Sequence, residues 1–135
     1  MALTTTVTPA EITRVGVAAY EGKAYKLCLA NNTTGLTALS TVAQWDAAQL
    51  TGNGYYSVEG TIGTGTFEST GTVFTLPQLT ATFTAAGGNW TYNTLYVTLT
   101  SGSTTTLHSI VVESPEVTLI DGGSITYRVS LFTDD

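Results

Sequence analysis

Charged residues are scarce in this chain of 135 residues. Only Arg14, Lys23, Lys26 and Arg128 are basic, against ten acidic residues, and the formal net charge is -6. A surface that follows nucleic-acid phosphates needs clustered Lys and Arg side chains. The sequence therefore argues against nucleic acid as a direct partner.

Cysteine and histidine occur once each. Cys28 excludes an internal disulfide and lies in an apolar run, where we expect a small buried hydrophobe and not a reactive thiol. The lack of cysteine pairs fits synthesis and assembly in a reducing cytoplasm. His108 is the only histidine available for a Ser-His-Asp arrangement, and no Gly-x-Ser-x-Gly elbow is present. We expect that this chain is not an enzyme.

Recognisable metal and phosphate motifs are also missing. Glu113, Glu116 and Asp121 could supply oxygen ligands to Ca²⁺, but they lack EF-hand spacing, and the single Cys and His lie far apart in sequence. The glycines of residues 60–65 lack the Lys-Ser/Thr ending of a phosphate-binding loop. We expect no metal and no other cofactor.

Long apolar runs are absent, and the first residues have neither a basic segment nor an apolar core. These features predict neither a membrane span nor a secretion signal.

Threonine, in contrast, makes up about one residue in five. Its β-branched side chain fits a pleated strand, and its hydroxyl tolerates water. Seven or eight short segments with strand character, separated by turn residues, follow one another from residue 24 to the C-terminus. Together with a hydrophobic fraction of 42%, this pattern predicts a mainly β chain. We expect a single antiparallel β-sandwich or jelly-roll-like domain with one or two short helices.

The chain divides into an extended N-terminal arm, residues 1–8, and one domain, residues 9–135. Thr8-Pro9-Ala10-Glu11 is a helix-start signature, but the apolar residues of the stretch 12–19 that follows fit a strand equally well. Residues 24–30 predict a strand. Thr41 and Gln44 form a capping box that predicts a short helix through Leu50, held to the sheet by Trp45.

The C-terminal half predicts further strands. Leu95, Val97 and Leu99 alternate, and Leu107, Ser109 and Val111 continue a similar rhythm. Asp121-Gly-Gly123 indicates a hairpin turn between the two last strands.

Four stretches of the sequence carry a resemblance. They are Tyr25–Asn31 (YKLCLAN), Leu50–Tyr56 (LTGNGYY), Gly88–Val97 (GNWTYNTLYV) and Val117–Val129 (VTLIDGGSITYRV). In this order they resemble the strands of small virion proteins of tailed bacteriophages. The resemblance implies a β-rich structural protein that oligomerises on a capsid or tail.

We therefore expect a capsid cement or decoration protein, located on the virion and assembled in the host cytoplasm. Its partners would be the major capsid protein, or another virion protein, and further copies of itself, expected as a homotrimer. The arm could add to the sheet edge of a neighbour, and low charge suits subunit packing. The candidate assembly contacts are Leu3, Val7, Tyr55, Tyr56, Trp90, Tyr92 and Phe132.

Other functions stay open at this point. Composition does not distinguish a cement or decoration protein from a tail, neck or fibre component of the virion. A carbohydrate-binding module would need Tyr55, Tyr56, Trp90 and Tyr92 on one exposed face, and a glycoside hydrolase would need two carboxylates that face each other in a cleft.

Overall fold

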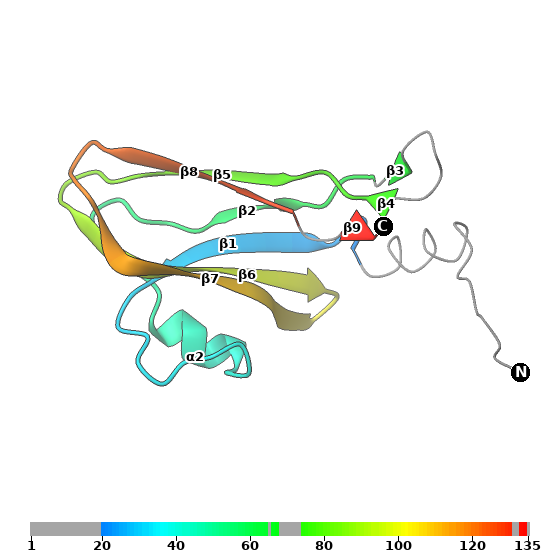
Figure 1. Cartoon of the computed structure of the whole chain (residues 1–135), viewed down its shortest axis with the longest axis horizontal. Coiled ribbons are helices and arrows are strands. Elements are labelled where there is room, and N and C mark those ends of the chain that lie inside the picture. The colour runs from blue at the N-terminus through cyan, green and yellow to red at the C-terminus, as the bar shows by residue number, and fades with distance from the viewer. Residues whose placement is uncertain (1–19, 65, 68–73, 131–132, 135) are drawn as a thin grey trace, which may run out of the picture. The chain divides into compact units, whose positions relative to one another are not determined.

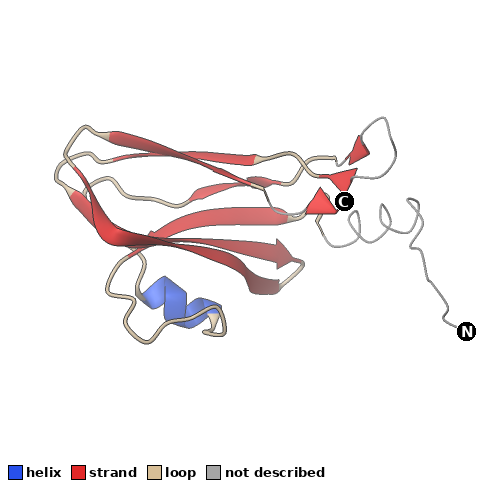
Figure 2. Cartoon of the chain, viewed as in Figure 1, coloured by secondary structure: helices blue, strands red, loops and turns tan. Residues whose placement is uncertain are grey.

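A computed structural model describes residues 20–64, 66–67, 74–130 and 133–134 (Figure 1). Its contacts divide into two compact units, of which the larger comprises residues 24–60 and 80–127. The strand pairs β1–β6, β3–β4, β4–β9 and β6–β7 are antiparallel, and the described residues include one helix (Figure 2). The expectation of a mainly β chain with antiparallel sheets and a short helix is confirmed.

A four-stranded sheet forms the base of the larger unit. Its strand order is β2-β1-β6-β7. The bounds are β1 Ala24–Ala30, β2 Val58–Thr61, β6 Trp90–Ser101 and β7 Thr104–Leu119. The bounds of β1 agree with the sequence prediction, because apolar residues fill that segment and turn residues flank it.

A second layer of two strands, β5 (Leu79–Thr84) and β8 (Ser124–Val129), lies over this sheet in a sandwich-like arrangement (Figure 1). Along β5, buried and exposed residues alternate strictly. Phe83 of β5 packs on Tyr55, and Tyr127 of β8 meets Tyr92 of β6 edge to face. Aromatic rings therefore fill much of the space between the layers.

Helix α2 (Val42–Ala47) covers the opposite face of the four-stranded sheet (Figure 1). The capping box of Thr41 and Gln44 is present as predicted. Trp45 is buried and packs on Tyr96 with a centroid distance of 5.5 Å, which confirms that it attaches the helix to the sheet. The helix ends at Ala47, three residues before the predicted end.

The expected hairpin at Asp121-Gly-Gly123 is wrong. The turn exists, because the N–H of Gly123 donates to the carbonyl of Ile120 at 2.7 Å. However, β7 pairs with β6, whereas β8 pairs with β5, so the turn carries the chain from one layer to the other. Backbone hydrogen bonds from the N–H of Ala85 to the carbonyl of Gly123 and from the N–H of Gly122 to the carbonyl of Ala85 fix the start of β8 beside the end of β5.

The smaller unit contains the three-stranded sheet β3-β4-β9. Its strands are β3 Thr66–Phe67, β4 Phe74–Thr75 and β9 Thr133–Asp134. The predicted arm, the segment 9–19 and the candidate contacts Leu3, Val7 and Phe132 lie outside the described residues.

Candidate assembly edge

Strand β6 is an inner strand of the four-stranded sheet, and β7 is its edge strand. Residues Thr94–Leu99 of β6 are all buried, because the second layer and α2 cover its two faces. Neighbouring β7 is exposed or half-buried along its whole length. Among the strands that the structure describes, none pairs with the outer edge of β7.

The middle of β7 exposes apolar side chains. In the register with β6, Val111 faces Leu95, Ile110 faces Tyr96 and Val112 faces Thr94. Val111 is 44% exposed and Val112 is 63% exposed. Ile110 is half-buried and packs against the buried cluster under α2, which consists of Cys28, Ala30, Trp45 and Tyr96. Thus Ile110 and Val112 lie on the helix face, and Val111 lies on the face opposite α2.

A bulge of four residues ends this stretch on its C-terminal side. The register passes from Thr94–Val112 to Tyr92–Val117, so the four residues Glu113–Glu116 stand opposite Asn93 alone. Bulges bend a strand and end its pairing.

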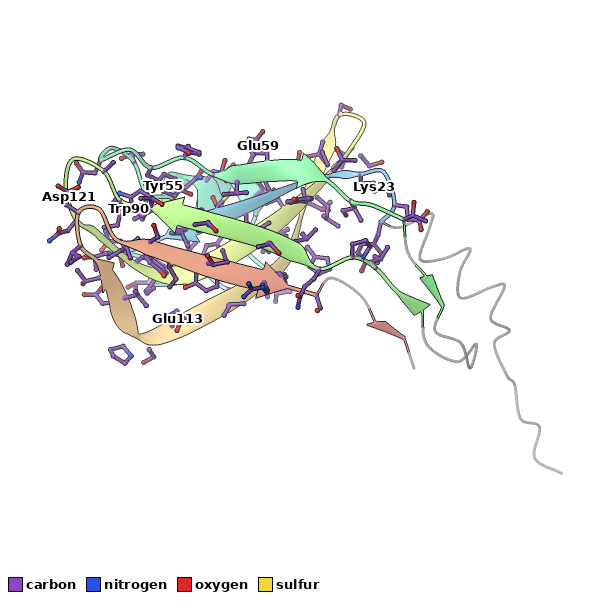
Figure 3. All side chains as sticks on the ribbon, turned by 90° about the horizontal axis from the view of Figure 1, so that it is seen from above. Lys23, Tyr55, Glu59, Trp90, Glu113 and Asp121 are labelled. Carbon is purple, nitrogen blue, oxygen red and sulfur yellow. The ribbon has the colours of Figure 1, made fainter. Side chains whose placement is uncertain are left out.

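A chain of hydrogen bonds holds the start of this bulge. The hydroxyls of Tyr92 and Tyr127 lie 2.7 Å apart, and Tyr127 donates to the carboxylate of Glu113 at 3.3 Å. Burial raises the pKa of both phenols. Glu113 projects from the ribbon of β7 in Figure 3.

A second irregularity marks the N-terminal side. Ser109 pairs with Val97 and Leu107 pairs with Thr98, so His108 is an extra residue in β7. Its Nδ1 lies 2.9 Å from the hydroxyl of Ser109. Because of this bulge, Leu107 contacts the cluster under α2, and the predicted single face of Leu107, Ser109 and Val111 does not form.

We call Thr104–Val112 the open edge. It contains no acidic residue, no Lys or Arg and no proline. Natural edge strands usually carry such residues, because an unpaired row of N–H and C=O groups invites pairing with another chain.

The other edge of the same sheet is different. Strand β2 has four residues, and Glu59 of β2 forms an ion pair with Lys26 of β1 at 3.2 Å. The ring of Tyr25 lies over Gly60 so closely that a Cβ atom there would be 2.5 Å from its hydroxyl oxygen. Short length and charge therefore protect this edge, and Gly60 makes room for an aromatic ring and not for a phosphate.

The aromatic candidates from the sequence do not share an exposed face. Trp90 and Tyr92 are buried, and Tyr55 is half-buried. Tyr55 and Trp90 lie side by side (Figure 3), with ring centroids 5.4 Å apart, and the indole N–H donates to the carbonyl of Asn53. Tyr56 alone is exposed, at 76%. The rings of Trp90 and Tyr92 belong to the core of the larger unit, so the proposed sugar-stacking platform does not form, and their contact with other chains stays a prediction.

Reactive side chains are used in packing. Cys28 is buried as predicted, and burial raises its pKa to about 12, so the thiol stays protonated. Tyr96 donates to the carboxylate of Asp46 at 2.7 Å, and burial raises the pKa of this phenol. Asp121 accepts a hydrogen bond from the N–H of Gly87.

A hollow of about 500 Å³ lies beside α2. Carboxamides, hydroxyls and short apolar side chains line it, among them Asn31, Asn32, Thr34, Leu36, Gln49 and Leu50. None of its lining residues is charged or aromatic, so it offers neither an acid-base pair nor a stacking surface.

The described part of the chain contains no group of three or more His, Cys, Asp or Glu side chains placed to hold a metal ion. Within that same part, no helix is long and apolar enough to cross a membrane. Comparisons of the chain with protein-family models, with curated proteins and with solved structures found no match.

Proposed function

We propose that this chain is a structural protein of a bacteriophage virion, a capsid cement or decoration protein that binds the major capsid protein. The observation that supports an assembly function best is the open edge. Its backbone groups pair with none of the described strands on that side, Val111 and Val112 are exposed beside them, and the segment contains no Asp, Glu, Lys or Arg.

The chemistry of the described residues favours assembly over catalysis. Cys28 lies inside the core with a raised pKa, and the buried phenols hydrogen-bond to neighbouring side chains. The proposed location on a virion rests on the resemblance of the sequence to phage virion proteins. The open edge is the feature that such a protein would use to bind a neighbour.

The experiment is to purify virus particles from the cells that produce this chain and to search them for it. We expect mass spectrometry to find it in intact particles and immunogold labelling to place it on the outside of the head. Labelling of tails or necks would replace the head location with the tail, neck or fibre alternative. Particles that lack the chain would overturn the virion proposal.

A further inference from the structure

The open edge matches itself in one antiparallel register. Two identical edge strands that pair antiparallel are related by a two-fold axis perpendicular to the sheet. Residues that oppose each other across the axis must lie on the same face of the sheet. This requires one residue to oppose its own copy at the axis, because an axis between two successive residues would oppose side chains of different faces. The regular stretch between the two bulges is Ser109–Val112. We therefore compare three registers, in which Ile110, Val111 or Val112 opposes its own copy and is the centre of the pairing.

Centring on Val111 gives the best match. It places Val111 against Val111 on the face opposite α2, and Ile110 against Val112 twice on the helix face. Glu113 then opposes Ser109, so no two carboxylates meet, which matters in a chain with a net charge of -6. Centring on Val112 would oppose Val111 to Glu113, and centring on Ile110 would oppose Val112 to the bulged His108.

We propose that two copies of this chain pair through β7, antiparallel and centred on Val111, and so join their four-stranded sheets into one continuous sheet. This inference rests on the proposed assembly function and names the partner of the open edge. The opposite edge is the poorer partner for β7, since β2 is four residues long and carries the ion pair of Glu59 with Lys26. Pairing of β7 with β2 would also be head-to-tail, whereas β7 with β7 closes after two copies.

The first test measures mass in solution. Light scattering of the full chain from micromolar concentrations upward should show twice the chain mass of 14.1 kDa. In this register each copy's Val112 opposes Ile110 of the other copy, so Val112→Lys introduces two charges into the apolar contact. We expect it to raise the dimer dissociation constant at least about tenfold. Ile120→Lys is the matched control, because Ile120 is 66% exposed but lies in the turn after β7. It should leave the dimer unchanged.

The second test reads the register. Opposed residues of antiparallel strands have Cβ atoms about 4.5–5.5 Å apart, close to disulfide range. Under mild oxidation, Val111→Cys should therefore cross-link to itself, whereas Val112→Cys alone should not. A mixture of Ile110→Cys and Val112→Cys chains should cross-link. Native Cys28 is buried, so the unmodified chain serves as the uncross-linked control.

Several outcomes would overturn the pairing. They are a monomeric mass at all concentrations, a trimeric mass, an equal loss of association in Val112→Lys and Ile120→Lys, and equal cross-linking of Val111→Cys and Val112→Cys. A trimer would favour the oligomer expected from the sequence. A chain that is monomeric in solution but present on purified particles would overturn the pairing and leave the virion proposal standing.

Discussion

The threonine hydroxyls of this chain bond to one another across strands. Thr82 lies 2.9 Å from Thr126, Thr84 lies 2.7 Å from Ser124, and Thr100 lies 2.8 Å from Thr105, each measured between hydroxyl oxygens. Such pairs stabilise a sheet by a few tenths of a kcal/mol to about 1 kcal/mol each. Threonine thus explains how exposed strand faces are stabilised without charge, and it does not by itself mark a surface that another chain must cover.

The Tyr55 hydroxyl accepts two hydrogen bonds in the larger unit. It accepts the N–H of buried Leu29 at 3.0 Å and the side-chain amide of Gln49 at 2.7 Å. Tyr55→Phe keeps the ring but leaves that backbone N–H without its acceptor. We expect the free energy of unfolding in urea to fall by about 1–3 kcal/mol. Tyr56→Phe, at the exposed neighbouring position, should change it by less than about 0.5 kcal/mol, and equal losses would contradict this role.

Elements were predictable where the signal was local. The bounds of β1 follow from the apolar residues that fill it and the turn residues that flank it, and the start of α2 follows from the capping box. The partner of β8 was not predictable, because Asp121-Gly-Gly123 specifies a turn but not the sheet that receives the next strand. Pairing between β5 and β8 depends instead on the distant residue Ala85.

Bulges also limited what the sequence could predict. Strict alternation puts Tyr92 and Tyr96 on one face, yet Tyr92 bonds to Tyr127 of β8 and Tyr96 packs on Trp45 of α2. The register irregularity between Tyr92 and Thr94 lies between them. No residue type in this stretch announces it, so the faces of the candidate aromatics could not be assigned from spacing.

The capping box of α2 gives a prediction at the scale of the element. The hydroxyl of Thr41 accepts from the N–H of Gln44, and the Gln44 side chain accepts from the N–H of Thr41. With six residues, the helix depends on its caps and on Trp45. Thr41→Ala should therefore lower the free energy of unfolding by about 1 kcal/mol and speed hydrogen exchange in α2. Thr51→Ala, at an exposed site outside the helix, is the control; exchange that is equal in both variants would contradict the prediction.

At the scale of the larger unit, the two edges of one sheet differ in length and in charge. Composition predicted a low-charge β chain, but only the strand order shows that Glu59 and Lys26 flank the short edge while Val111 and Val112 flank the long one. The candidate site therefore depends on pairing that neighbouring residues in the sequence do not encode. This is why the sequence pointed to aromatic contacts, whereas the side chains exposed in the middle of the open edge are aliphatic.

The buried ionisable groups make the stability of the larger unit sensitive to alkali. Burial raises the pKa of Cys28 from 9.0 to about 12, and that of Tyr55 from 10.0 to about 12, and it also raises those of Tyr92, Tyr96 and Tyr127. Above about pH 9 the unfolded chain loses these protons while the folded chain keeps them, so the unfolded state binds fewer protons. The free energy of unfolding must then decrease as the pH rises.

We therefore expect full stability below about pH 9 and a progressive loss up to about pH 12, measured as a falling urea midpoint. Part of the tyrosinate absorbance should appear only together with the loss of the circular dichroism of the folded chain. Cys28→Ala, which removes the lowest of these titrations, should delay the onset of the loss toward higher pH. Ionisation of every tyrosine near pH 10 with an unchanged urea midpoint would show that the phenols are not held in the core as the structure places them.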